Sequence, residues 1–434
     1  MLLTLEALKA AEGDSLLLHW GTAGAQPKLS VIDGGPARTY EDYLLPRLLQ
    51  ISTNRGLSQL QLDLVMVSHL DSDHIVGVKK LFRQLRKEVD DQIPQSHRRL
   101  KVKRLWHNIF NDIVGDSTDA YYQKLPASLL AISSGAPSPQ LETKIKTAIQ
   151  TRYGIPEAKA EQEAAWVAAI LAAHGDGREL RTDYDFLYQQ RAIDMALNAP
   201  FKDAHGKPRL IQADASQSSV TVDGLKLEIL GPKKAEIEAL QIEFDRWLKT
   251  RDSTEASILS AYADRSAKNL SSIVCLASLG GKTILFTGDA RGDKILETLE
   301  EAGHLAQGTL KIDVLKVPHH GSDNNVEPTF FKKVIADHYV FSGDGKHGNP
   351  ERATLDWLTA ARGNHAQYTI HLTYPVSSID LERKKDMEKR GRTWAADTHS
   401  LESFFKMRQD EKYAFTLKDS ERVVIELGDE SIAW

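Results

Sequence analysis

The residues that could do chemistry gather where an apolar run of the sequence ends. Residues 65–67 are apolar and lead directly into Ser-His-Leu-Asp-Ser-Asp-His at 68–74. This segment places His69, Asp71, Asp73 and His74 within six positions. Crowding imidazoles and carboxylates at the end of a strand is costly through desolvation and repulsion unless a cation compensates it. Because both groups ligate divalent ions, the spacing predicts a metal site with room for two neighbouring ions. The alternative is a polar loop that caps the next helix, with Asp73 as N-cap and His74 exposed.

Two later apolar runs end in the same way. Residues 284–286 precede Thr-Gly-Asp at 287–289, and residues 314–317 precede Pro-His-His-Gly-Ser at 318–322. A Gly-Asp pair after a strand is by itself equally consistent with a helix cap. If the three strands are neighbours in one sheet, however, their ends converge at one edge and a metal or catalytic role is favoured. The predicted metal ligands are then His69, Asp71, Asp73, His74, Asp289 and His320.

A metal-bound hydroxide would be the nucleophile at such a site, and other residues would assist it. Asp73 is predicted to orient the hydroxide, and His319, beside His320, to stabilise the oxyanion or protonate the leaving group. Asp14 and Asp33 are interpreted as structural hydrogen-bonding residues, and His107 as either a satisfied structural histidine or a residue of the pocket. The predicted substrate-binding residues are Asn269, Ser271, Ser322 and Asn108.

The motifs together resemble those of the metallo-β-lactamase superfamily, and within it the ComEC-type branch of competence DNA-uptake hydrolase domains. The resemblance is carried by Gly-Asp at 13–14, Ile-Asp-Gly-Gly at 32–35, and the segments 68–74, 287–289 and 319–322. It covers most of the chain outside a helical insertion. It implies a four-layer αββα sandwich, two divalent metals, a bridging hydroxide and a bridging aspartate, here Asp289. It also makes His347, in Gly-Lys-His-Gly-Asn-Pro at 345–350, a second candidate for the catalytic acid.

The sequence departs from the superfamily pattern at two positions of the first metal. Asp71 stands where the second histidine is usual, and Asn-Leu-Ser-Ser at 269–272 stands where a third histidine is usual. Fewer nitrogens and one more carboxylate make a harder donor set, so we expect manganese to compete with zinc or replace it. A second hypothesis is that one metal alone is bound, by Asp73, His74, Asp289 and His320.

The surrounding pattern is that of an α/β protein. Strand-like runs occur at 15–20, 29–32, 62–67, 102–106, 225–230, 272–278, 283–286, 314–317 and 339–342, and a helix is predicted at 75–86. Residues 111–198 read as a helical insertion or cap. The prediction is a single domain over 1–434 that contains this insertion, with residues 365–434 as a C-terminal extension.

Composition indicates a cytoplasmic protein. The 434 residues are 41% hydrophobic with a formal net charge of −5, so there is no global basic character that would favour nucleic acid. A single cysteine excludes an internal disulfide framework. The N-terminus lacks the layout of a signal peptide, and no apolar run reaches the roughly 20 residues that span a bilayer, so no membrane association is expected.

These features favour a hydrolase of phosphodiesters or nucleic acid. Two basic clusters, at 98–104 and 383–392, could contact a phosphate backbone or could be solvated faces balanced by nearby acids. The alternatives are hydrolysis of a non-phosphate ester or lactone, and a subunit of a multiprotein DNA-processing or defence system whose helical insertion binds a protein partner. A metal-binding scaffold without catalysis is disfavoured because Asp73 and His319 are both present.

Overall fold

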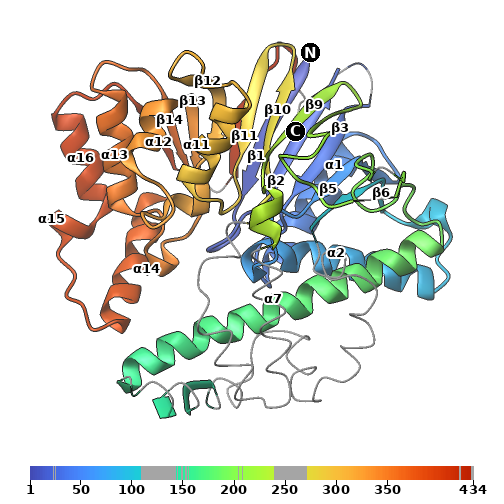
Figure 1. Cartoon of the computed structure of the whole chain (residues 1–434), viewed down its shortest axis with the longest axis horizontal. Helices are drawn as coiled ribbons and strands as arrows, with labels where there is room; N and C mark the ends of the chain where they lie inside the picture. Colours follow the sequence, from blue (N-terminus) through green and yellow to red (C-terminus); the bar gives the residue numbers. More distant parts are fainter. Residues whose placement is uncertain are drawn as a thin grey trace.

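Two β-sheets form the centre of the protein in the computed structural model (Figure 1). The structure describes residues 1–22, 24, 26–108, 143, 145–147, 150–151, 154, 156–203, 205–207, 209–238, 271–419 and 422–431. The chain is a mixed α/β protein, as predicted.

The first sheet is built from the N-terminal strands and closed by a strand from near the C-terminus. Its order is β16-β1-β2-β3-β5-β7. The strands are β1 (Leu2–Leu8), β2 (Leu16–Gly21), β3 (Lys28–Ile32), β5 (Leu64–Met66), β7 (Leu105–Trp106) and β16 (Arg422–Glu426). β16 pairs antiparallel with β1, while β3, β5 and β7 run parallel, so the ends of β3 and β5 lie at the same edge.

The second sheet has the order β15-β14-β13-β12-β11-β10-β9-β8. Its strands are β8 (Ser219–Val222), β9 (Leu225–Gly231), β10 (Val274–Leu279), β11 (Lys282–Phe286), β12 (Leu310–Lys316), β13 (Val334–Phe341), β14 (Thr369–Leu372) and β15 (Thr416–Asp419). From β11 to β15 the neighbours are parallel, so the ends of β11, β12 and β13 also share one edge. The predicted C-terminal extension, 365–434, therefore supplies β14 and β15 to this sheet and β16 to the other.

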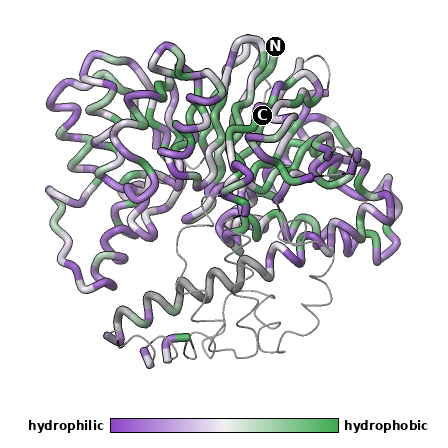
Figure 2. Tube along the Cα trace, in the orientation of Figure 1, coloured by the Kyte–Doolittle hydropathy of each residue, from purple (hydrophilic) through white to green (hydrophobic). Residues whose placement is uncertain are grey.

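Alternation along the strands explains why each sheet is buried on both faces. In β2, Leu16, Leu18 and Trp20 point into a core shared by the two sheets, whereas Leu17 points into a core on the opposite face. Side chains alternate along a strand, so a run that is apolar at every position fits a sheet covered on both sides. Figure 2 shows the hydrophobic residues along the strands and more hydrophilic residues on the helices outside them.

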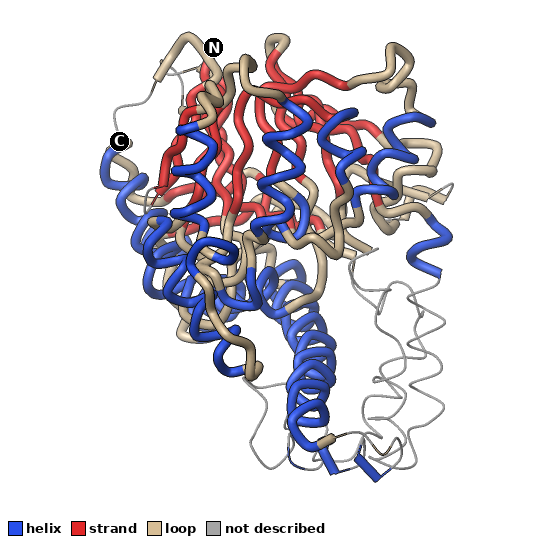
Figure 3. The backbone as a smooth tube through the Cα atoms, turned by 90° about the vertical axis from the view of Figure 1, so that its left-hand side faces the viewer, coloured by secondary structure: helices blue, strands red, loops and turns tan. Residues whose placement is uncertain are grey.

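Helices cover the outer face of each sheet (Figure 3). The first sheet is covered by α1 (Leu45–Asn54), α2 (Ser72–Asp90) and α7 (Glu157–Gln189). The second is covered by α11 (Gly292–Glu301), α12 (Pro328–Lys333), α13 (Arg352–Arg362), α14 (Val376–Lys389) and α16 (Leu401–Asp410), with α15 (Ala396–His399) beside α16. The three cores thus hold helices, sheet, sheet and helices together in that order.

The predicted helical insertion contains the long helix α7, which lies along α2. Charged pairs join the two helices: Lys79 lies 3.1 Å from Glu179 and also pairs with Asp176, and Asp183 accepts from Arg83 at 2.8 Å and from Arg86 at 2.9 Å. Within the predicted insertion, residues Glu157–Gln189 form this helix, whereas residues 111–142 lie outside the described residues.

Two predicted strands are wrong in extent, because each is broken in the middle. The run 62–67 divides at Asp63 into β4 (Leu60–Leu62) and β5, and the run 102–106 divides into β6 (Leu100–Val102) and β7. β4 and β6 form a small parallel sheet of their own, so the chain leaves one sheet and enters another. The Asp63 carboxylate accepts the amide of Leu29 at 3.1 Å, which fixes this step against β3.

No helix among the described residues has both the length and the apolar character needed to cross a membrane.

Candidate metal centre

The loop between β5 and α2 delivers the first group of predicted ligands. Asp71 is the N-cap residue of α2, yet its carboxylate makes no capping hydrogen bond. Asp73 and His74 lie in the first turn, and the His74 side chain is fully buried. The alternative of a polar helix cap, with Asp73 as N-cap and His74 exposed, is therefore wrong. Asp71 is the N-cap residue, and the His74 side chain is buried.

A backbone-to-backbone contact holds this turn in place. Gly34 donates its amide to the His74 carbonyl at 2.7 Å, and Gly77 donates to Gly35 at 3.0 Å. A Cβ at Gly77 would lie 1.9 Å from the Gly34 oxygen, so only glycine permits the approach. The Gly-Gly pair after β3 therefore positions the ligand-bearing turn of α2.

Asp289 reaches the same place from the second sheet. It follows Gly288, which adopts φ +48° and would bring a Cβ within 3.0 Å of Ser68. The tight turn at the end of β11 carries the Asp289 carboxylate over the end of β5, and its side chain is only 3% exposed. The predicted residues do converge, but the expectation that their strands are neighbours in one sheet is wrong. β5 lies in the first sheet and β11 and β12 lie in the second, and the two sheets pack through a shared core, so their strand ends meet.

The tandem histidines after β12 adopt an uncommon backbone conformation. His319 has φ 47° and ψ 48°, and His320 has φ 55° and ψ 17°. Left-handed conformations cost about 1–3 kcal/mol each for residues other than glycine, so the surrounding structure must impose them. The consequence is that two adjacent side chains both lie near Asp289, at 3.5 Å from His319 Nε2 to Oδ2 and 3.4 Å from His320 Nε2 to Oδ1.

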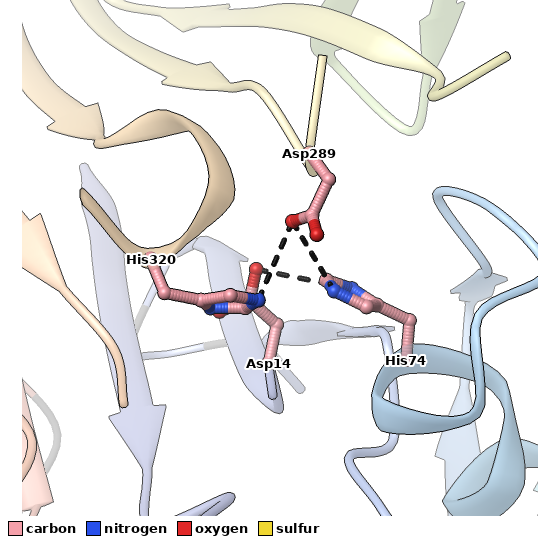
Figure 4. Close-up of side chains that lie close together, drawn as sticks. All are labelled: Asp14, His74, Asp289 and His320. Atoms are coloured by element: carbon pink, nitrogen blue, oxygen red, sulfur yellow. Dashed lines mark ion pairs between the residues drawn. The ribbon is translucent and has the colours of Figure 1, made fainter. Parts of the chain in front are cut away.

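The imidazole Nε2 atoms and carboxylates surround Asp289 at a characteristic spacing (Figure 4). His74 Nε2 lies 3.3 Å from Asp289 Oδ1, and His69 Nε2 lies 3.7 Å from Oδ2. The Asp73 carboxylate lies 3.5 Å from His320 Nε2, and Asp71 lies 3.7 Å from His69 Nε2. Ligand atoms bound to one ion at about 2.0–2.2 Å are about 3.4 Å apart in tetrahedral geometry, so this spacing fits atoms that share a cation.

Hydrogen bonding separates the two nitrogens of each ring. His74 Nδ1 lies 2.8 Å from Asp33 Oδ2, and His320 Nδ1 lies 2.9 Å from Ser342 Oγ. In contrast, the Nε2 atoms of His69, His74 and His320 and the Oδ1 atom of Asp289 are buried without a hydrogen-bond partner. Buried polar atoms are normally satisfied. These unsatisfied atoms all face the interior of the cluster, where a divalent cation would satisfy them together.

Asp14 belongs to the same buried group but lies on its other side. Asp14, His74, Asp289 and His320 form a cluster that could hold a metal ion. The Asp14 oxygens, however, face the Nδ1 atoms, at 3.9 Å from His74 and 3.5 Å from His320, and Oδ2 is paired with Lys316 Nζ at 2.8 Å. Since Nδ1 and Nε2 point in opposite directions, Asp73 fits as the fourth ligand and Asp14 as a residue that orients the rings.

The buried carboxylates of the cluster create an environment that favours positive charge. Burial lowers the pKa of His74, but the attraction of Asp289, Asp73 and Asp33 outweighs it and raises the pKa well above its ordinary value. His320 behaves in the same way. Burial raises the pKa of Asp289, yet the neighbouring histidines hold it well below its usual range.

Other predicted residues have different surroundings. The side-chain amide of Asn108 hydrogen-bonds both the amide and the carbonyl of Ile211, so its polar atoms are occupied. Ser271 and Ser322 are buried, and Asn269 lies outside the described residues. His347 is exposed in a left-handed turn. Their role in substrate binding or catalysis stays a prediction.

His107 is a buried histidine beside this region. Burial lowers its pKa to about 3, so the ring is neutral, and neither ring nitrogen has a hydrogen-bond partner. The Asn198 side chain fixes its backbone by accepting from the amide at 2.7 Å and donating to the carbonyl at 3.1 Å. A role for His107 in the pocket stays a prediction.

The two basic clusters are largely paired with the protein's own acids. Lys101 pairs with Asp194 at 2.8 Å, and Lys103 and Arg104 both approach Asp223. In the second cluster, Arg383 is buried and donates to the Pro350 carbonyl, and its neighbours Lys384, Lys385 and Arg390 pair with acids on the same helix. Several charges of both clusters thus stabilise local structure.

The sequence did not point to two residues that support Asp14 and the histidine rings. Ser342 and Lys316 end two strands of the second sheet, and both contact Asp14. A lysine with 1% exposure in an apolar strand is the signal that could have indicated a buried carboxylate partner. No protein-family model and no curated protein matches the chain.

Proposed function

We propose that the protein is a metal-dependent hydrolase of the metallo-β-lactamase fold that cleaves phosphodiesters, nucleic acid among them. The observation that carries the proposal is the group of buried, unsatisfied Nε2 and carboxylate atoms around Asp289. The order of helices, sheet, sheet and helices supports the four-layer fold, and the site lies at an edge to which both sheets contribute strand ends.

One divalent ion would be held by His74, His320, Asp73 and Asp289. A second ion would be held by His69 and Asp71 together with Asp289. Bound ions lower the pKa of a coordinated water and stabilise charge on the phosphoryl oxygens. Asp73 is 25% exposed, so its free oxygen is on the open side of the cluster, where it can orient the attacking water. The exposed His347 is the proposed proton donor to the leaving group.

A phosphodiester fits the donor set better than a β-lactam or thioester. Three carboxylates make the set hard, which favours oxygen-rich ligands and ions such as manganese. Paired ions also clamp the attacking and leaving oxygens of a phosphoryl transfer. The paired basic clusters support no long cationic track, so recognition is assigned to the metal site itself.

The test is hydrolysis of bis(p-nitrophenyl) phosphate and single-stranded DNA by metal-stripped protein that is resupplied with manganese or zinc. We expect turnover with manganese and a loss of more than about 100-fold in Asp289→Ala, because that carboxylate touches both halves of the cluster. Asp337→Ala is the matched control, since Asp337 is an exposed aspartate on β13. No turnover with either metal, in protein that binds metal, would move the substrate class away from phosphodiesters.

A further inference from the structure

His319, which the sequence suggested as a proton donor, lies close to Asp289. His319 Nε2 lies 3.5 Å from Asp289 Oδ2, and the same oxygen lies 3.7 Å from His69 Nε2. His69 Nε2 in turn lies 3.7 Å from Asp71 Oδ2. His74 and His320, in contrast, face the other oxygen, Oδ1.

The two oxygens of Asp289 therefore divide the histidines into two pairs. One pair, His74 and His320, is buried with Asp73 on the Oδ1 side. The other pair, His69 and His319, lies on the Oδ2 side with Asp71. A carboxylate that bridges two ions presents one oxygen to each, which is the geometry that this division offers.

We infer that His319 is a metal ligand, completing a first metal position with His69, Asp71 and Asp289 Oδ2. The inference rests on the proposed function only in requiring that the cluster bind metal. It changes the predicted role of His319 from proton donor to ligand. It also supplies the nitrogen donor that the segment 269–272 lacks.

The histidine inventory of the chain supports this assignment. The longest segments outside the described residues, 109–142 and 239–270, contain no histidine, so neither can supply an imidazole to the first position. The backbone gives a second argument. His319 and His320 both adopt the left-handed conformation, which is costly for residues other than glycine, and in this turn both imidazoles lie near Asp289.

The first position would be the more accessible of the two. Two ligands of the first position are partly exposed, His319 at 27% and Asp71 at 30%, whereas on the Oδ1 side Asp73 alone is partly exposed, at 25%. We therefore expect the Oδ1 side to bind its ion more tightly and the Oδ2 side to exchange its ion faster. The partial exposure also leaves room for a substrate oxygen or water as a further ligand.

The experiment counts metals and measures their affinities in the full chain, by elemental analysis after dialysis and by competition with a chelator. For the wild type we expect two manganese ions. His319→Ala should keep the tighter ion with unchanged affinity and lose more than about 100-fold in affinity for the weaker one, since replacing even an outer residue costs 10–100-fold. His69→Ala should give the same result, and the double variant should be no worse than either single variant.

His365→Ala is the matched control, because His365 is exposed and distant in sequence from the site. Circular dichroism and thermal unfolding establish that each variant is folded, and His319→Gln provides a second variant of similar size. Two ions bound with wild-type affinity in His319→Ala would overturn the inference and return His319 to the role of proton donor. A single ion in the wild type would also overturn it while leaving the proposed function intact, whereas no metal at all would refute both.

Discussion

Replacing Asp33 with asparagine should weaken metal binding although Asp33 touches no metal. Its Oδ1 accepts the Ser68 amide at 2.7 Å, and its Oδ2 lies 2.7 Å from Ser68 Oγ and 2.8 Å from His74 Nδ1. In Asp33→Asn the carbonyl oxygen can keep the amide of Ser68, which turns the NH₂ group toward His74. Nδ1 must then accept, so the proton moves to Nε2 and blocks the atom that binds the ion.

The expected loss is 10–100-fold in metal affinity, equivalent to about 1.4–2.7 kcal/mol, as for other residues that orient a ligand. The assay is a competition titration with a chelator at pH 7.5, supported by thermal unfolding of the metal-free protein. Asp63→Asn is the control, because Asp63 is also a buried aspartate that accepts a backbone amide, but it lies away from the cluster. If folded Asp33→Asn bound metal within twofold of the wild type, the tautomer argument would be refuted.

Three further predictions concern stability. Gly77→Ala should destabilise the fold by about 3 kcal/mol or more and abolish metal binding, because its Cβ would meet the Gly34 carbonyl; chemical denaturation measures this, and a loss below about 1 kcal/mol would contradict it. Glu6 is buried, which raises its pKa, but His19 and Arg47 lower it to about 2, so its stabilisation is complete above its unfolded value near 4.5 and is lost as the pH falls toward 2. The acid-induced loss attributable to this group should be about 3 kcal/mol and absent in Glu6→Gln, as measured by urea unfolding at a series of pH values. Asp183→Asn should cost about 1–2 kcal/mol, since its two arginine partners are partly exposed, and should increase hydrogen exchange in α7; exchange unchanged in α7 would show that apolar packing alone holds it to α2.

The sequence indicated which residues gather, because these residues follow apolar runs. His69, Asp289 and His320 follow β5, β11 and β12, but the sequence did not show that these strands belong to two different sheets. The alternation of apolar residues also identified most central strands. What local patterns could not show is pairing between distant segments: β16 joins β1 across nearly the whole chain, and neither strand was predicted.

The break between β4 and β5 at Asp63 and the proximity of His319 to Asp289 were not predicted, for a related reason. A continuous apolar run gives no sign that the chain changes sheets within it, since that step depends on the bond between Asp63 and β3. Adjacent side chains can point to different places, so the sequence suggested different roles for His319 and His320. The turn in which both lie near one carboxylate has left-handed backbone at both residues, which a local sequence pattern does not reveal.

The distribution of hydrogen bonds distinguishes a metal centre from a structural polar network. A network that served only the fold would satisfy both nitrogens of each buried imidazole, because each unsatisfied buried atom costs about 1–3 kcal/mol. Here Nδ1 of His74 and Nδ1 of His320 are satisfied by Asp33 and Ser342, while the Nε2 atoms opposite them are not. The left-handed turn at 319–320 adds a further cost in backbone strain. The fold therefore keeps several buried ligand atoms without hydrogen-bond partners, which is energetically costly. A bound cation would remove this cost. The difference between the two nitrogens of each imidazole is the strongest physical reason to propose a metal site here.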